Sequence, residues 1–286
     1  MGETVEAVSG TPYADYVDAN ILGPLGLDDT RAGIPAQLYG QQMAVGWGAL
    51  EADGTRPEVG LFDPAGITPA AGFTASVADL AKFASWTFRL ASSGEEEVLR
   101  PSTLREMQRV HYISPDWETS WGLGFSVRQE GGTTVVGHGG ACPGYRSALM
   151  LAPSESMGVA VAMNAMDDPG GIARGIAALV KARGEAAPFD PVAGVDLADY
   201  AGVYSGQPWD SDFMLIPWAG GLTWLDPDAV EPARALWRLK PLGGDRFRVV
   251  TDKGAEREAV TFERDAAGQV RAIRRHANLS PRLRGL

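Results

Sequence analysis

The stretch Gly137–Ser147, GHGGACPGYRS, holds the residues whose types and spacing are best suited to chemistry. It places His138 at the end of an apolar run, followed by two glycines and a Pro-Gly pair that predicts a turn. Glycines around one functional side chain are typical of places where a ligand approaches the backbone closely. N–H groups at such a strand edge can bind a carbonyl oxygen as it becomes an oxyanion. The stretch is therefore either a site for acyl chemistry or a glycine-rich hairpin with an incidental histidine.

The residue types of the chain also bear on two other kinds of site, a Cys/His pair and a metal centre. Cys142 lies four residues from His138, which would suit a Cys/His pair. We favour a small buried side chain for this cysteine, because residues four apart near a strand end do not combine a shared face with a short distance, as they do on a helix. The three histidines are scattered and show no H-E-x-x-H spacing, so the sequence predicts no catalytic metal and no cofactor.

Four short runs rich in β-forming residues should position the His138 stretch. They are separated by short turns, which favours an antiparallel meander. The last of them is apolar throughout and predicts a strand buried on both faces. The runs are Gly122–Gln129, Gly132–His138, Tyr145–Pro153 and Ser156–Asn164.

Helices are predicted before and after this meander. Ser76, with Asp79 three residues later, has the pattern of a capping box at the start of a helix that Gly94 ends. Apolar spacing predicts further helices over 11–22, from Pro101 to Met107 and over 170–183. Residues 31–72 show no sustained period and predict an irregular connection with short strands near Gln41–Trp47.

The composition of the chain changes after residues 185–194, which look like a linker. From Val195 onward, short strand-like runs such as Ala235–Leu242 and Asp245–Asp252 predict a small all-β domain. Its acidic and basic residues are equal in number, so the net charge of −11 lies in the first 194 residues. Its aromatic residues favour core packing over a ligand pocket. These aromatics are Tyr200, Tyr204, Trp209, Trp218, Trp224 and Trp237.

Composition also excludes some classes of function. A net charge of −11 argues against non-specific binding of nucleic acid. No window approaches about 18 consecutive apolar residues, so no membrane span is predicted. The first ten residues, MGETVEAVSG, lack the basic and apolar regions of a signal peptide.

The His138 stretch resembles the third motif of the penicillin-recognising serine hydrolases. This family carries S-x-x-K, then Tyr-x-Asn or Ser-x-Asn, then K-T-G on a core strand. In its class C β-lactamase and esterase branch, the third motif often has His for Lys, followed by x-G and then P-G. His138, Gly140, Pro143 and Gly144 match that pattern.

The resemblance extends over nearly the whole chain. Residues 5–31, 69–86 and 138–164 are similar to family segments in the same order, and Asp199–Gly206 resembles the start of a lipocalin-like β-barrel found in many members. It implies an α+β fold, with an antiparallel sheet flanked by helices and a small all-β barrel. The expected domains are a β-lactamase-like domain over 1–184 that lacks its N-terminal portion, a linker over 185–194 and a barrel over 195–286.

The first two family motifs are missing from the sequence. The residues three positions before the four lysines are Asp79, Ala178, Trp237 and Val250, and none is serine. No Tyr-x-Asn or Ser-x-Asn occurs either. In the family both motifs precede the segment matched by residues 5–30, so the resemblance implies an N-terminal truncation.

The resemblance also implies roles for the residues that are present. The N–H of Ala141, just after the third motif, would donate to an oxyanion, and His138 with Gly140 would complete the motif. His138 would assist proton transfer or hold the substrate.

The implied function is that of a serine hydrolase acting on a β-lactam, a D-amino-acid peptide or a small ester. The acyl-enzyme would form on a serine outside this chain, which would be inactive alone. The alternatives are a non-catalytic binding or interaction protein that self-associates through an exposed strand edge, and a lipocalin-like ligand carrier centred on residues 195–286.

Overall fold

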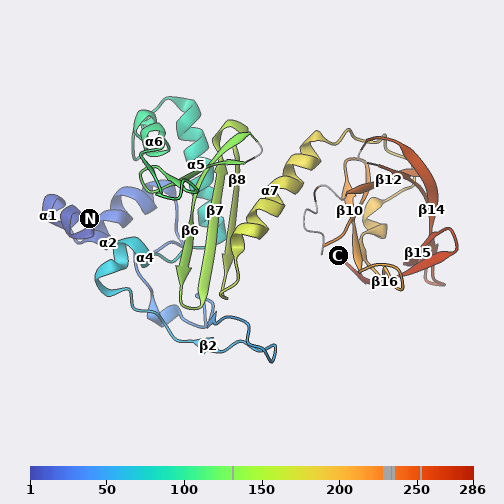
Figure 1. The fold of residues 1–286 in the computed structure, drawn as a ribbon, viewed down its shortest axis with the longest axis horizontal. Coiled ribbons are helices and arrows are strands. Elements are labelled where there is room, and N and C mark those ends of the chain that lie inside the picture. The colour runs from blue at the N-terminus through green and yellow to red at the C-terminus, as the bar shows by residue number, and fades with distance from the viewer. Residues whose placement is uncertain (131, 228–232, 234–235, 252) are drawn as a thin grey trace. The chain divides into compact units, whose positions relative to one another are not determined.

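The computed structural model describes residues 1–130, 132–227, 233, 236–251 and 253–286. It divides into two compact units, Met1–Ala177 and Ala178–Leu286, which are described separately. Figure 1 shows a sheet with helices in the first unit and a barrel in the second. Ala235 and Asp252, which belong to predicted strands, lie outside the described residues.

A six-stranded antiparallel sheet forms the centre of the first unit, and it confirms the predicted meander. Its order follows the sequence, and each strand pairs with the next. The four predicted runs form the last four strands, and a short hairpin adds the first two. The strands are β3 (Tyr112–Ile113), β4 (Ser120–Trp121), β5 (Ser126–Glu130), β6 (Thr133–Cys142), β7 (Tyr145–Ala152) and β8 (Met157–Met163).

Helices pack against both faces of this sheet because its strands alternate apolar side chains between the faces. On one face, α5 (Val77–Ser93) and α6 (Pro101–Met107) bury Leu90 and Leu104 against Val136 and Leu151. On the other, α7 (Pro169–Glu185) buries Ala173 and Ala177 against Met150 and Val159. The two apolar layers fix which face each residue of β6 occupies.

Helix α5 begins and ends as its sequence predicts. The Ser76 hydroxyl accepts a hydrogen bond from the N–H of Asp79 at 3.1 Å, and Gly94 ends the helix with a left-handed φ of 76°. The Asp79 carboxylate is buried and accepts from the Asp29 N–H at 2.8 Å and from the Thr30 hydroxyl at 2.9 Å. It also lies 2.9 Å from the Lys82 ammonium. Asp79 therefore ties residues 29–30 to α5.

The pKa of the Asp79 carboxyl lies below its ordinary value of 3.8. Burial raises the pKa, but the hydrogen bonds from Lys82, from Thr30 and from the Asp29 amide together outweigh that effect. The lowered pKa means that the folded state favours the ionised carboxylate, which therefore stabilises the fold.

We expect Asp79→Ala to lower the free energy of unfolding by about 2–3 kcal/mol at neutral pH, because the buried Thr30 hydroxyl and the part-buried Asp29 N–H lose their acceptor. The pKa of Asp79 is lower in the folded than in the unfolded state. The carboxylate therefore contributes its full stabilisation at a pH above the unfolded-state pKa, and this contribution is lost as the pH falls through the folded-state pKa. Urea unfolding of both proteins at neutral pH and near pH 3 measures the difference. A difference of the same size at both pH values would contradict the assignment.

The N-terminal helical region is less regular than predicted. The helix expected over 11–22 is α-helical only in α2 (Tyr13–Val17), continues as a π-helical turn (Asp18–Leu22) and ends in α3 (Gly23–Leu25). Another helix, α1 (Gly2–Ser9), precedes it. Residues 31–72 form the predicted irregular connection. It contains the short strands β1 (Gly46–Trp47) and β2 (Glu58–Val59), and α4 (Thr68–Ala71).

Strand β8 is not buried on both faces, which corrects the prediction from its apolar sequence. Val159 is buried, Ala160 is half-buried and Ala162 is exposed. The reason is its position, since within the described residues β8 is the last strand of the sheet and has β7 as its one strand partner. Within the described helices of the chain, none is long and apolar enough to cross a membrane.

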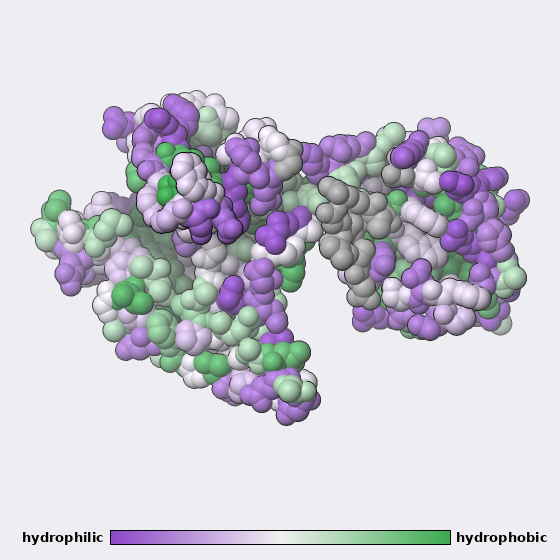
Figure 2. Space-filling model, in the orientation of Figure 1, coloured by the Kyte–Doolittle hydropathy of each residue, from purple (hydrophilic) through white to green (hydrophobic). Residues whose placement is uncertain are grey.

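A closed barrel of eight antiparallel strands forms the second unit, which confirms the predicted all-β domain. Consecutive strands pair, and the last strand closes on the first. Hydrophilic residues predominate on its visible face (Figure 2). The strands are β9 (Gly202–Tyr204), β10 (Phe213–Trp218), β11 (Gly221–Leu225), β12 (Trp237–Gly243), β13 (Arg246–Val250), β14 (Glu256–Arg264), β15 (Val270–Arg275) and β16 (Asn278–Gly285).

Aromatic side chains fill the interior of the barrel. The ring of Tyr200 lies 4.9 Å from that of Phe247 and 4.7 Å from that of Phe262, between centroids. The Tyr204 hydroxyl donates to the carbonyl of Tyr200 at 2.8 Å, and burial raises the pKa of Tyr204 to about 12. The predicted core packing is therefore confirmed for the two tyrosines. In contrast, the exposed fractions of Trp209 and Trp237 are 78% and 40%.

Candidate functional site

The hairpin of β6 and β7 positions the predicted site residues. Its two-residue turn is Pro143–Gly144, where Gly144 has a φ of 82° that favours glycine. A Cβ on Gly144 would also lie only 2.8 Å from the Cα of Gly46. The turn sets a register in which His138 lies opposite Leu149 and Gly140 lies opposite Ser147.

The strand places His138 and Gly140 on one face of the sheet and Ala141 on the other. Alternate side chains of a strand point to the same face, and Val136 is buried on the face that α5 and α6 cover. The same face therefore carries residues 138, 140 and 142. His138 is exposed on that face, beyond the part that the helices cover. The side chain of Ala141 points to the opposite face, so only its backbone can act beside His138.

The edge of β6 is open next to His138. Strand β5 pairs with β6 only as far as Gly137, which lies opposite Ser126. The Ser126 hydroxyl donates to the Gly137 carbonyl at 3.0 Å, so that carbonyl points toward the β5 side. Polar backbone groups of alternate residues point to the same side of a strand, and the N–H groups of Gly139 and Ala141 therefore face the open edge. Within the described residues, neither has a backbone acceptor.

The imidazole of His138 is held at this edge in one orientation. Its Nδ1 lies 2.6 Å from the carbonyl oxygen of Gly139, and its ring centroid lies 5.8 Å from that of Trp121. A carbonyl accepts only, so Nδ1 carries the hydrogen and Nε2 of the neutral ring keeps its lone pair. Nε2 can therefore accept a proton or a hydrogen bond from a bound molecule.

The glycines of the motif have separate structural reasons. A Cβ on Gly137 would overlap the carbonyl oxygen of Leu149 in β7, and a Cβ on Gly140 would overlap the Ser147 hydroxyl. At Gly139 a Cβ would meet only an ordinary contact, 3.6 Å from the Ser147 carbonyl oxygen. The sequence reasoning missed Trp121 and Ser147, although counting back from the Pro143–Gly144 turn pairs Ser147 with Gly140.

Cys142 does not pair with His138. The two share a face of β6, but four residues of strand separate them by roughly 13 Å. The Cys142 thiol donates to the carbonyl oxygen of Ala71 at 3.3 Å instead, and the side chain is half-buried. This arrangement agrees with a structural cysteine.

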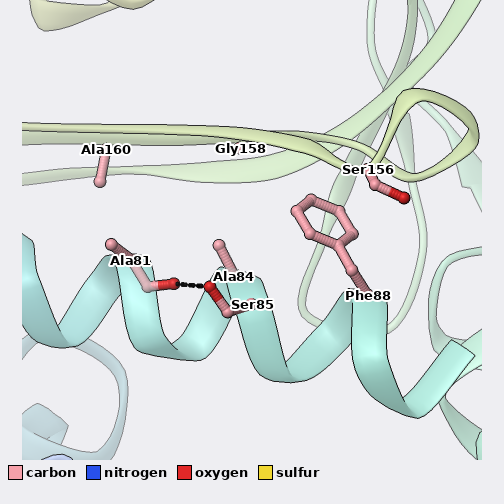
Figure 3. Close-up of a pocket in the computed structure, with 7 residues that line it drawn as sticks. All are labelled: Ala81, Ala84, Ser85, Phe88, Ser156, Gly158 and Ala160. Atoms are coloured by element: carbon pink, nitrogen blue, oxygen red, sulfur yellow. Dashed lines mark hydrogen bonds between the residues drawn. The ribbon is translucent and has the colours of Figure 1, made fainter. Parts of the chain in front are cut away.

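A cavity of about 240 Å³ lies between α5 and β8 and not at His138 (Figure 3). Its polar side chains are two serines, and the Ser85 hydroxyl donates to the carbonyl of Ala81 at 2.9 Å. The cavity carries no acid, base or nucleophile pair. The candidate site is therefore the open edge of β6 and not this cavity.

Comparison with known proteins identifies the class to which this fold and hairpin belong. The family model described as Beta-lactamase matches residues 1–183, well over half of the chain. The chain therefore belongs to the Beta-lactamase family, the penicillin-recognising serine hydrolases. Homologues with this fold are serine hydrolases that act on amides and esters. No curated protein matches the sequence.

Two of the following three solved structures, those with a TM-score of 0.50 or more, agree with the fold. The octameric penicillin-binding protein homologue from Pyrococcus abyssi is 21% identical, over 98% of this chain and 62% of that one, with a TM-score of 0.56. SurE is 23% identical, over 99% of this chain and 65% of that one, with a TM-score of 0.50. A D-stereospecific amidohydrolase from Streptomyces sp. is 24% identical over 57% of this chain and 47% of that one, with a TM-score of 0.47. The chain thus spans less than two thirds of the length of these proteins.

Proposed function

We propose that this chain supplies the carbonyl-binding part of a serine hydrolase that cleaves an amide or ester through an acyl-enzyme. The observation that carries the proposal is the open edge of β6, which the N–H of Ala141 faces and where the imidazole of His138 is held by the Gly139 carbonyl. An unpaired N–H fixed by a sheet is a preorganised donor for developing negative charge.

Each residue at the edge has a role in this proposal. The N–H of Ala141 donates to the substrate carbonyl oxygen, and Nε2 of His138 accepts a proton or a hydrogen bond from the substrate or the leaving group. Gly139 and Gly140 present no side chain there, so an acyl group can lie against the backbone. Trp121 and the Gly139 carbonyl keep the imidazole in place.

The acylating serine of this reaction lies outside residues 1–286. Nucleophilic catalysis needs a hydroxyl and a base within hydrogen-bond reach. In this sequence no lysine follows a serine by three residues, and no Tyr-x-Asn or Ser-x-Asn occurs. We therefore propose that the chain binds an acyl substrate without forming a covalent intermediate by itself. The substrate is a β-lactam, a D-amino-acid amide or peptide, or a small ester.

Titration of the isotope-labelled protein with benzylpenicillin, a D-alanyl-D-alanine peptide and a small ester, followed by amide NMR, tests the proposal. We expect at least one of the three to shift the amide signals of Gly139 and Ala141. Ala141→Pro removes the N–H that faces the open edge without breaking the ladder to β7, and it should weaken binding about tenfold.

Ala141→Val is the matched control, because it changes the same exposed side chain and keeps the N–H. Its affinity should stay within about twofold of the parent protein. Equal binding by the proline and valine variants, or shifts confined to residues away from β6, would contradict the proposed role of Ala141.

A further inference from the structure

One end of the barrel in the second unit carries a pocket of about 220 Å³. Antiparallel strands alternate in direction, so β12 and β14 begin at the same end of the barrel at which β13 and β15 finish (Figure 1). The pocket lies at this end, and its lining residues are Trp237, Val249, Thr251, Arg257, Glu258 and Arg275. The open edge of β6 belongs to the first unit, so the two sites share no residue.

The side chains of Trp237 and Arg275 lie on the inner face of the barrel. Leu239 belongs to the barrel core, and alternate residues of a strand share a face, so Trp237 faces inward from β12. The same spacing from Ile273 places Arg275 on the inner face of β15. The Arg275 guanidinium lies over the Trp237 ring, 4.8 Å from its centroid, although β13 and β14 separate the two strands. Such a contact forms across the barrel opening, so the pocket lies inside this opening.

The Arg275 guanidinium is held in place but keeps donors for a ligand. Its Nε donates to a Glu258 carboxylate oxygen at 2.5 Å, and its planar group lies over Trp237. Among the residues that the structure describes, none accepts a hydrogen bond from its two terminal amino groups. A guanidinium matches a carboxylate through two parallel hydrogen bonds. Because two contacts already hold Arg275, binding a carboxylate costs little of its side-chain entropy.

Apolar surface lies beside this charged group. The side chain of Trp237 remains partly exposed, and Val249, which is buried in the barrel core, also lines the pocket. Aromatic rings pack well against planar apolar groups. The volume of about 220 Å³ is below the range of about 300–1,000 Å³ that holds drug-sized molecules, so the ligand should be small.

The charges of the pocket favour an anion. Its lining contains the guanidinium groups of Arg257 and Arg275 and the carboxylate of Glu258. The acidic excess of the chain lies in the first 194 residues, whereas the barrel sequence has equal numbers of acidic and basic residues. An anion therefore meets a net positive lining in a domain that carries no excess negative charge.

We propose that this pocket binds a small monocarboxylate that carries a planar apolar group, such as an arylacetate. The carboxylate accepts two hydrogen bonds from the terminal amino groups of Arg275, and the apolar group packs against Trp237 and Val249. Glu258 keeps the guanidinium in place and is not displaced by the ligand. The proposal is independent of the proposed function, because no residue of the β6 edge takes part.

Titration of the isotope-labelled whole chain with phenylacetate, followed by the indole N–H signal of Trp237 in NMR spectra, tests this proposal. The variant Trp237→Phe assigns that signal. We expect the signal to shift with a dissociation constant below about 1 mM, and the affinity to fall as the salt concentration rises. Phenylacetamide keeps the ring but is neutral, so it should bind at least about tenfold more weakly.

Arg275→Gln removes the charge and the paired donors, and it should weaken phenylacetate binding at least about tenfold. Arg274→Gln is the matched control, because Arg274 is the neighbouring residue on the outer face and binds Glu263 at 2.8 Å. Its affinity should stay within about twofold of the parent value. The comparison of the two ligands uses the parent protein and does not depend on the folding of either variant. No shift of the Trp237 signal at about 10 mM phenylacetate, equal binding of phenylacetamide, or equal losses in the two arginine variants would overturn the proposal.

Discussion

Replacing Gly137 with valine is expected to lower the free energy of unfolding by at least about 3 kcal/mol. Any Cβ at this position overlaps the carbonyl oxygen of Leu149, which belongs to the backbone of the adjoining strand β7. A backbone atom cannot move aside without breaking the ladder that holds β6 to β7. Urea unfolding followed by tryptophan fluorescence measures the loss.

Gly139→Val is the matched control for the Gly137 variant. It lies two residues further along β6 on the same face, where a Cβ meets only the Ser147 carbonyl oxygen at the ordinary distance of 3.6 Å. Its free energy of unfolding should stay within about 1 kcal/mol of the parent value. Equal losses in the two variants would mean that β6 and β7 do not approach as described.

The second large effect is expected in the barrel, where Phe247→Ala should cost about 3–5 kcal/mol. Phe247 is completely buried and contacts the rings of Tyr200 and Phe262, with centroids 4.9 and 5.2 Å away. Removing the ring leaves a cavity in an interior that aromatic side chains fill. Near-ultraviolet circular dichroism during urea unfolding reports on this aromatic core.

Trp209→Ala removes a larger ring from the same unit and serves as the control for the Phe247 variant. Trp209 is 78% exposed and donates one hydrogen bond to the Asn278 side chain at 3.2 Å. Its loss should cost less than about 1 kcal/mol. A cost as large as that of Phe247→Ala would show that the described interior of the barrel is wrong.

Features that depend only on residues close together in the sequence were predicted correctly. Ser76 and Gly94 bound α5 because a cap and a left-handed glycine act within one turn of the helix. The Pro143–Gly144 turn set the register of β6 and β7 for the same reason. The meander followed from short links between strand-like runs.

Features that depend on distant residues could not be predicted in this way. The open edge of β6 exists because β5 pairs no further than Gly137, and the sequence of β6 contains no sign of that limit. The apolar sequence of β8 would suit a central strand as well as an edge strand. The prediction assumed a central strand and therefore overestimated its burial. Closure of the barrel depends on the pairing of Arg282 with Tyr204, which are far apart in sequence. The contact of Trp121 with His138 likewise joins separate strands.

The most direct test of the proposed function is intact-mass measurement of the whole chain after incubation with a fluorophosphonate and with labelled benzylpenicillin. The open edge of β6 can bind a carbonyl, but residues 1–286 contain no S-x-x-K to supply an acylated serine. The predicted result is an unmodified mass of 30.3 kDa with both reagents, from the same sample in which a substrate shifts the Ala141 amide signal. A stoichiometric adduct on a serine of this chain would contradict it.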